Sequence, residues 1–365
     1  MASVTKRVSM IPRMDSEAKK VKLKEWLRTK LPLAKDLSIT PLEKATGGFG
    51  SPIRFFDLRW KEDGQEKTEE LVIQQEPRSP PPDYNLAMQF YTMKCLHGSD
   101  VPVPKVYWLE EDRNVLGTPF FIMAKVEGEI LDPQVPGQEP RGLLYEASPE
   151  RRTKLWEQAI EVIAKINTLN WANLGISFLY IPKLGVTVLE RQIAIYERLA
   201  KWVEVVSPSF LGSAFDWFKE NKFEPKYLSL CWGDARPGNL MYRNDEVVAV
   251  LDWDMVHIGP PESDLAWFLA LDWMTSDECA GLRVPRWEGL PEREEAIRHY
   301  EAVTKGNLDN FFYHEAFAML KMGIIFSQIV KYQIVKGMPE TPSAYAAPKA
   351  ALRRLANMLD MEDRL

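Results

Sequence analysis

The sequence predicts an α+β protein with two lobes: an N-terminal antiparallel sheet with one helix, and a larger, mainly helical lobe. Short β-rich runs separated by turn residues fill residues 37–126. From Glu150 onward, apolar residues recur with a period near 3.6, and only residues 228–256 interrupt this pattern with short apolar strands. We therefore expect a basic helical segment over 1–36, a sheet lobe over 37–126 and a helical lobe over 127–365.

The basic N-terminal segment predicts an amphipathic helix over residues 16–31. Apolar side chains recur among its lysines at roughly helical spacing, and Pro32 is expected to end the helix. These apolar residues are Val21, Leu23, Trp26, Leu27 and Leu31.

The sheet lobe is predicted from strands that flank one good hairpin signal. The runs IRFFDLRW and ELVIQQE are separated by the turn residues Glu62-Asp-Gly64. The runs LSITPLEKA, VPVPKVYWLEED and TPFFIMAKV read as further strands, and one helix is expected over residues 84–97.

Composition narrows the class of protein. The 365 residues are 45% hydrophobic and 27% charged with a net charge of −6, a globular composition that argues against a nucleic-acid binder. Three cysteines, far apart and without CxxC spacing, indicate neither a disulfide framework nor a zinc site. No secretory signal or bilayer-length apolar run is found. We expect a cytoplasmic protein with no nucleic-acid or membrane partner.

The stretch CWGDARPGNL, followed by VVAVLDWD, carries the strongest chemical signal. It spaces Asp234, Asn239 and Asp252 around a short apolar strand. Carboxylate and amide oxygens are the ligands that Mg²⁺ prefers. Phosphoryl transfer needs a metal to neutralise phosphate charge and a group that orients the attacking hydroxyl. Asn239 and Asp252 could bind the metal, and Asp234 could orient the attacking hydroxyl. Any one of them alone would be an ordinary turn residue.

The run WGDARPGNLMY…VVAVLDWDMVHIGPPESDLAWFL resembles the aminoglycoside phosphotransferase-like family, whose core is shared with protein kinases and choline kinases. The resemblance implies a protein kinase-like two-lobed fold, ATP and Mg²⁺ as cofactors, and transfer of the γ-phosphoryl group to a small-molecule hydroxyl. By residue, Asp234 matches the catalytic base, and Asn239 and Asp252 match the metal ligands. Asp264 matches a buried aspartate that braces the catalytic loop, or it is a residue favoured at a helix N-terminus.

Three residues near this motif need separate interpretation. Trp232 stands where the family usually has His, a scaffold position. Asp254 replaces the more common Glu of D-W-E and could approach a second metal. Arg236, a candidate catalytic residue, could contact phosphate or substrate, or it could be a structural ion-pair partner.

The nucleotide is expected in the sheet lobe. The loop ATGGFGS supplies glycines whose backbone can approach phosphates, although a plain hairpin turn would also explain it. The strand FFIMAKV resembles the hinge whose backbone pairs with adenine. The candidate cofactor-binding residues are Gly47, Gly48, Gly50, Ser51, Val72, Gln74, Ala124 and Val126.

Gln74 is a departure from the family pattern. Alternation along the strand puts Val72 and Gln74 on one face, where the family has a Lys or Arg that holds the phosphates. The helical partner, normally Glu, is Gln89. Because charge-assisted hydrogen bonds are stronger than neutral ones, we expect weaker ATP binding unless Arg78 or Arg54 substitutes.

The acceptor stays open. The family name suggests an aminoglycoside. The motifs also resemble kinases that act beside acyl-CoA dehydrogenases and phosphorylate hydroxyacyl-CoA thioesters, which implies functional coupling to an acyl-CoA dehydrogenase-like enzyme. A C-terminal lobe rich in Trp, Tyr and Met favours the apolar acceptor slightly. Because Gln74 and Gln89 replace charged residues of the family, the protein could instead be a nucleotide-binding pseudokinase with weak or no turnover.

Overall fold

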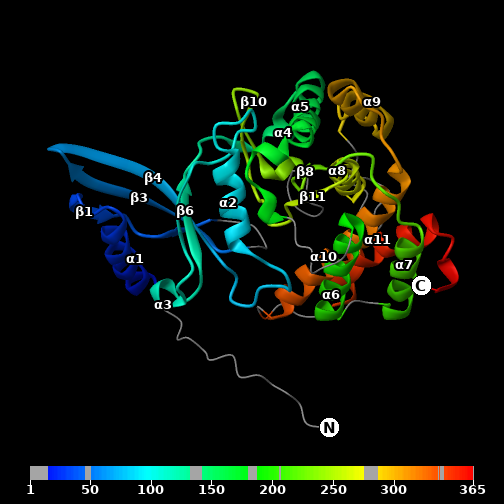
Figure 1. The fold of residues 1–365 in the computed structure, drawn as a ribbon, viewed down its shortest axis with the longest axis horizontal. Helices are drawn as coiled ribbons and strands as arrows, with labels where there is room; N and C mark the ends of the chain where they lie inside the picture. The colour runs from blue at the N-terminus through cyan, green and yellow to red at the C-terminus, as the bar shows by residue number, and fades with distance from the viewer. Residues whose placement is uncertain are drawn as a thin grey trace, which may run out of the picture. The chain divides into compact units, whose positions relative to one another are not determined.

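The computed structural model describes residues 15–45, 51–131, 142–179, 187–204, 207–274, 287–335, 337 and 341–364. They form two compact units (Figure 1). The described parts of Met1–Pro80 and Lys105–Lys125 make the sheet unit, and those of Pro81–Pro104 and Val126–Leu365 make the helical unit. The predicted α+β class, with an antiparallel sheet followed by a larger helical part, is confirmed.

The sheet unit is built on an antiparallel sheet with strand order β1-β3-β4-β6-β5, and β2 pairs with β3. The predicted hairpin joins β3 to β4 through Asp63 and Gly64, which both have positive φ angles. A short helix, α3, lies between β5 and β6. The bounds are β1 (Lys35–Ile39), β2 (Glu43–Lys44), β3 (Ile53–Glu62), β4 (Gln65–Gln75), β5 (Val106–Glu110), α3 (Arg113–Leu116) and β6 (Phe120–Ala124).

The predicted amphipathic helix forms as α1 (Ser16–Lys30) and belongs to the core of the sheet unit. The Asp15 side chain caps it by accepting a hydrogen bond from the Ala18 N–H at 2.7 Å. Leu23, Trp26 and Leu27 are buried in one cluster with strand residues, including Phe120 of β6. The helix therefore covers one face of the sheet.

The helical unit follows the expected pattern. Short strands form where the helical periodicity stops: β8 pairs with β11, and β10, β9 and β7 form a three-stranded sheet. The helix expected over 84–97 forms as α2, and its contacts group it with this unit. The helices are α2 (Leu86–Leu96), α4 (Leu143–Glu146), α5 (Pro149–Thr168), α6 (Val188–Val203), α7 (Pro208–Glu220), α8 (Glu262–Met274), α9 (Arg293–Thr304), α10 (Phe311–Val335) and α11 (Ala346–Met358). The strands are β7 (Glu129–Ile130), β8 (Ser229–Cys231), β9 (Leu240–Arg243), β10 (Glu246–Val250) and β11 (His257–Gly259).

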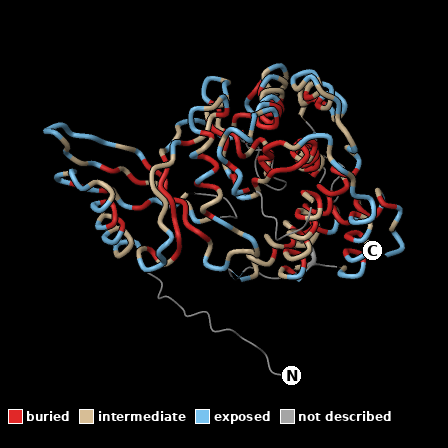
Figure 2. The backbone as a smooth tube through the Cα atoms, in the orientation of Figure 1, coloured by how far each residue is buried: buried red, intermediate tan, exposed pale blue. Residues whose placement is uncertain are grey.

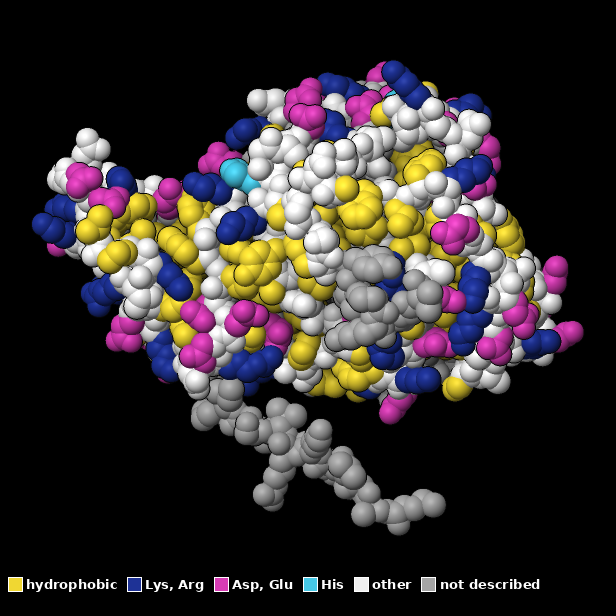
Figure 3. Space-filling view, in the orientation of Figure 1, with side chains coloured by type: hydrophobic (Ala, Val, Ile, Leu, Met, Phe, Trp, Pro, Cys, Tyr) yellow, Lys and Arg dark blue, Asp and Glu magenta, His cyan; other side chains and the backbone are white. Residues whose placement is uncertain are grey.

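The longest helix, α10, is the centre of the core of the helical unit. It packs against α6, α8 and α11, and it is buried along much of its length (Figure 2). On the face seen in Figure 3, basic and acidic side chains are interspersed. Among the described residues, no helix combines the length and the apolar character that crossing a membrane requires.

One buried and one half-buried histidine of the helical unit, His314 and His257, should make stability depend on pH. Burial lowers the pKa of His314 to about 3 and that of His257 to about 4. Both rings are therefore neutral in the folded state, whereas the unfolded chain binds protons near pH 6.5. As pH falls from 6.5 toward 4, the unfolded state binds more protons, and these two groups lower the free energy of unfolding.

We expect the His314→Gln variant, which cannot titrate, to gain stability relative to the wild type as pH falls through this window. Urea unfolding at pH 7.5, 6 and 5 measures the difference. A constant difference across the three pH values would contradict a neutral, buried His314.

Candidate active site

The motif-bearing loop begins directly after β8 and closes on a 3₁₀ turn, Pro237–Asn239, that leads into β9. Gly233 has φ +88°, and a Cβ there would lie 2.1 Å from the backbone oxygen of Met255. Only glycine fits this close approach of two backbone segments. The loop is therefore fixed against the segment that follows β10.

The Asp264 side chain fixes this loop through hydrogen bonds to its backbone. It lies fully buried in the first turn of α8. Its Oδ2 accepts hydrogen bonds from the Trp232 N–H at 2.7 Å and from the Asn167 side chain at 3.0 Å, and its Oδ1 accepts one from the Gly233 N–H at 2.8 Å. Burial raises the pKa of Asp264, and the bonds from Gly233, Asn167 and Trp232 act in the opposite direction. The bracing contact that the resemblance implied is thus present.

Trp232 takes over a scaffold role with its indole. The ring is fully buried, and its N–H donates to the backbone oxygens of Leu251 at 2.9 Å and Asp252 at 3.2 Å. Asp252 has φ +57°, a left-handed conformation that is uncommon outside glycine. The indole therefore ties the loop to the backbone that presents Asp252.

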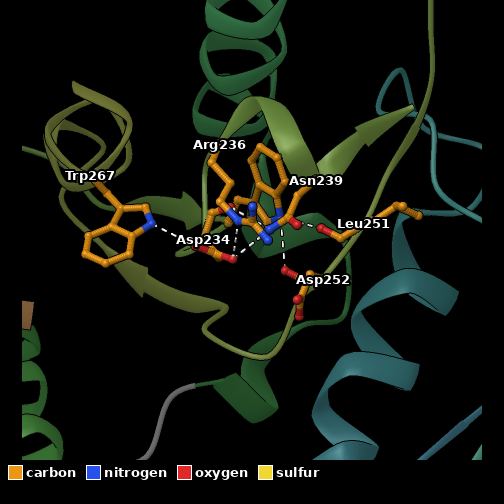
Figure 4. A network of polar contacts seen from close by, with 7 residues as sticks. Asp234, Arg236, Asn239, Leu251, Asp252 and Trp267 are labelled. Carbon is orange, nitrogen blue, oxygen red and sulfur yellow. Dashed lines mark hydrogen bonds and ion pairs between the residues drawn. The ribbon is translucent and has the colours of Figure 1, made fainter. Parts of the chain in front are cut away.

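Asp234, Arg236 and Asn239 converge in one polar network (Figure 4). The Asp234 Oδ2 accepts from the Asn239 amide at 2.6 Å and lies 3.1 Å from Arg236 Nε. Its other oxygen, Oδ1, accepts from the Trp267 indole N–H at 2.8 Å. Both oxygens of Asp234 are thus oriented by donors, with Arg236 as an ion-pair partner.

Sequence reasoning missed Trp267 as a member of the site. It lies three residues after Asp264 on α8, and this spacing puts both side chains on one helix face. The D-L-A-W run was therefore the available signal. One turn of α8 presents both the carboxylate that braces the loop and the indole that orients Asp234.

Asp252 and Asn239 are brought to the same place by the backbone. The Leu251 N–H donates to the Asn239 carbonyl at 2.9 Å, which joins the end of β10 to the start of β9. The Asn239 side chain uses its NH₂ group toward Asp234, which leaves the amide oxygen without a donor among the described residues. Asn239 Oδ1 and the Asp252 carboxylate are thus available as oxygen ligands.

The site has an excess of negative charge. Asp234, Asp252 and Asp254 influence one another, and the positive charge of Arg236 acts to lower the pKa values of Asp252 and Asp254. The side chains of Asp252 and Asp254 are in part exposed to solvent. The surrounding protein nevertheless desolvates both carboxyl groups, and this raises their pKa values. Repulsion from the neighbouring carboxylates raises them further, and the pKa of Asp252 is raised to about 6 in all. Such an arrangement favours binding of a cation. No three His, Cys, Asp or Glu side chains of the described residues form a complete metal-binding group.

The predicted nucleotide residues lie mostly in the sheet unit. Gly47, Gly48 and Gly50 fall outside the described residues, and Ser51 directly precedes β3. Val72 and Gln74 are buried on β4. The Ala124 N–H already donates to the Lys105 carbonyl at 2.8 Å, so that donor is engaged, and Val126 follows in the helical unit.

The structure contradicts the hypothesis that Arg54 replaces the missing cation at Gln74. Arg54 pairs in register with Ile73, and its guanidinium donates to the Gln75 side chain at 2.5 Å. Ile73 belongs to the core cluster with α1, and Lys19 of α1 also donates to Gln75. Because side chains alternate along a strand, Arg54 lies on the α1 face, opposite to Val72 and Gln74.

Arg78, the other proposed substitute, is exposed in the loop after β4. Gln89 is buried on α2, where its amide donates to the Tyr84 hydroxyl at 3.3 Å. Gln74 and Gln89 therefore belong to different units. A role for Arg78 and the amide pairing of Gln74 with Gln89 stay predictions.

Comparison with known proteins decides the family. A sequence model of the phosphotransferase enzyme family matches residues 58–299, more than half of the chain. The chain belongs to this family. The match includes the whole network around Asp234, Asn239, Asp252 and Asp264.

Several curated proteins and solved structures are similar to this chain. The chain is 27% identical over 279 residues to "Acyl-CoA dehydrogenase family member 10" of Mus musculus, a match that covers 72% of this chain but 24% of that protein. A crystal structure of a putative aminoglycoside phosphotransferase from Ralstonia eutropha is 25% identical, covers 96% of this chain and 99% of its own, and has a TM-score of 0.66. A thermostable mutant of aminoglycoside phosphotransferase APH(4)-Ia, solved as a ternary complex with ADP and hygromycin B, is 15% identical, covers 92% and 98%, and has a TM-score of 0.53.

We expect the Asp264→Ala variant to lose about 3 kcal/mol or more of unfolding free energy, because three buried donors lose their acceptor. The Asp264→Asn variant keeps one acceptor oxygen and should lose less. Urea unfolding of both variants measures the difference. Equal stability of Asp264→Ala and wild type would show that the loop is held by other contacts.

Proposed function

We propose that the protein is a small-molecule kinase that moves the γ-phosphoryl group of ATP to a hydroxyl group with the help of Mg²⁺. One observation supports this most strongly. Asp234 is oriented by Arg236, Asn239 and Trp267, while Asn239 and Asp252 present further oxygen atoms at the same place. A pure scaffold would need no such constellation.

In this mechanism Asp234 receives the proton of the acceptor hydroxyl. The hydroxyl oxygen forms a bond to the γ-phosphorus, the bond from that phosphorus to the bridging β-oxygen breaks, and ADP leaves. Because Trp267 holds one carboxylate oxygen and Asn239 and Arg236 hold the other, Asp234 meets the hydroxyl in a defined orientation. Such positioning is a main source of rate enhancement in phosphoryl transfer. Arg236 adds a positive charge beside the transferred group.

The residues present fit a magnesium ion. Asn239 Oδ1 is without a hydrogen-bond donor among the described residues, and Asp252 lies in a region of excess negative charge. Mg²⁺ in kinases is typically held by one or two protein oxygens together with substrate phosphates and water. When bound, the ion neutralises phosphate charge. Asp254 would help to attract it.

We propose that most of the residues that bind the nucleotide belong to the sheet unit. The candidate residues are Gly47, Gly48 and Gly50 with Ser51, the Val72 and Gln74 face of β4, and the chain from Ala124 to Val126. Support comes from the family match and from the ADP bound in the APH(4)-Ia complex. Because the Ala124 N–H is engaged, adenine pairing would rely on other backbone groups of this segment.

We favour a hydroxyacyl-CoA over an aminoglycoside as the acceptor. The curated relatives are acyl-CoA dehydrogenase family members, of which this chain matches the smaller part. A kinase associated with such a dehydrogenase would act on the same thioesters, which supports functional coupling. The aminoglycoside alternative is supported by the similarity to the Ralstonia eutropha structure.

One specific observation favours a second candidate, a pseudokinase. Gln74 has no positive charge, and Arg54 does not supply one on its face of β4. A neutral amide holds phosphate less strongly than a cation does. The intact arrangement of Asp234, Asn239 and Asp252 argues for turnover.

We expect Asp234→Asn to lower turnover by roughly 10²–10⁴-fold, because an amide cannot take the hydroxyl proton. ATP affinity should change little. ADP release, measured with the best acceptor from a panel of hydroxyacyl-CoAs and aminoglycosides, gives the rate, and nucleotide titration gives the affinity. Asp245→Asn, in the β9–β10 turn where Asp245 pairs with Arg151 at 2.7 Å, is the control and should keep its turnover. Near wild-type turnover of Asp234→Asn would remove Asp234 from this role.

The two faces of β4 give a second test. Gln74→Ala should weaken ATP binding by roughly threefold to tenfold, the value of one neutral hydrogen bond. Arg54→Ala removes a charged side chain from the opposite face and should leave ATP affinity unchanged. Calorimetric titration of both variants with ATP and Mg²⁺ makes the comparison. A larger loss in Arg54→Ala than in Gln74→Ala would reverse our assignment of the nucleotide face.

A further inference from the structure

The core of the helical unit contains a buried lysine that the proposed mechanism does not use. Lys321 lies near the middle of α10 and is only 4% exposed. It lines a small cavity with His257, His314 and apolar side chains that include Leu189 and Phe317. The space open to a water-sized sphere is about 20 Å³, which is room for about one water molecule or one ligand oxygen.

The carboxylates of Asp264 and Asp234 favour the charge of Lys321 electrostatically. Its ammonium group lies over two aromatic rings, 4.6 Å from the centroid of Trp267 and 5.6 Å from that of Tyr196. Within the part of the chain that the structure describes, no hydrogen-bond acceptor or carboxylate contacts this group directly. Burial lowers the pKa of Lys321 to about 8, so it stays mostly protonated at pH 7. Its donors are therefore available.

The neighbouring histidines do not compensate the charge. The ring nitrogen Nε2 of His314 is buried and has no hydrogen-bond partner among the described residues. His257 uses Nδ1 toward the Met255 carbonyl at 3.0 Å. Both rings are neutral, because burial lowers their pKa values to about 3 and about 4. The cavity thus has polar groups that a single polar atom could satisfy.

The cavity is adjacent to the proposed reaction centre. Trp267 contacts Lys321 with its ring face and donates its N–H to Asp234 Oδ1 at 2.8 Å. One indole ring therefore separates the ammonium group from the proposed base. A group bound by Lys321 would belong to the same small molecule whose hydroxyl meets Asp234.

We propose that Lys321 binds an acyl oxygen of the acceptor, either a thioester carbonyl or a carboxylate, and thereby selects a hydroxyacyl compound. This inference rests on the proposed kinase function and adds a residue that would recognise the acyl group of the acceptor. An oxygen that accepts a hydrogen bond satisfies the unused donors and fits the small space beside them. A polycationic sugar would instead bring positive charge toward a buried ammonium group.

A purely structural role explains Lys321 poorly. Asp264 and Asp234 favour its charge electrostatically, but a buried ammonium group still loses its hydration, and an apolar side chain of the same length would avoid that cost. Lys331, ten residues later on the same helix, shows the usual solution: it also stacks on an indole, but its ammonium group donates to the Trp202 carbonyl. Among the described residues, Lys321 has the aromatic contacts without an acceptor.

The test compares Lys321→Met with Lys331→Met as the matched control. The probes are hydroxyhexanoyl-CoA isomers, the corresponding free hydroxyhexanoates, and hygromycin B. Lys321→Met should raise KM for the acyl probes by tenfold or more, with a smaller change in kcat, and should leave ATP affinity and Tm at or above wild-type values. Lys331→Met should keep the wild-type KM. Lys321→Gln, which retains a donor without the charge, should fall between them and covers the case that Lys321→Met does not fold.

The outcomes separate the acyl sources and the two proposals. Wild-type turnover of the CoA thioesters identifies the carbonyl, and turnover of the free acids identifies the carboxylate. An unchanged KM for the acyl probes in both Lys321 variants, or wild-type turnover of hygromycin B alone, would overturn the role of Lys321 while the kinase function stands. Failure of the wild type to phosphorylate any probe, together with loss of ATP binding, would contradict both.

Discussion

The arrangement of the site depends on one buried carboxylate. Asp264 accepts hydrogen bonds from two consecutive backbone N–H groups, those of Trp232 and Gly233, and a third from Asn167. A buried charge is tolerated only when it is hydrogen-bonded in this way. Because the bonds act on the backbone, they fix the loop whatever side chains it presents. The position of Asp234 and Asn239 follows from this anchor.

Two tryptophan side chains also fix the positions of the site residues. Trp232 joins the loop to the backbone before Asp252, and Trp267 joins Asp234 to α8. Each indole buries a large apolar ring and places a single N–H donor at its edge. Rigid rings of this kind fix polar atoms with little loss of conformational entropy. The carboxylates can therefore stand close together in spite of their mutual repulsion.

The sequence predicted the two-part fold and the residues of the central motif. It did not predict features that depend on strand register or on the packing of helices. The spacing of Asp234, Asn239 and Asp252 was informative because a turn and one short strand determine where they lie. Arg54 was misjudged because the register of β3 against β4, which decides its face, cannot be derived from alternation within β4 alone. Trp267 and Lys321 were overlooked because a tryptophan or lysine in an apolar helix looks like core or surface until the neighbouring helices are known.

The position of α1 determines where the chain can be truncated for expression. The family match begins at residue 58, inside β3, but the apolar centre of the sheet unit already includes Leu23 and Leu27. A fragment cut for expression at the start of the match would lack α1, β1 and β2. In this fragment Ile73 and Phe120 would be exposed to water, and we expect the fragment to aggregate.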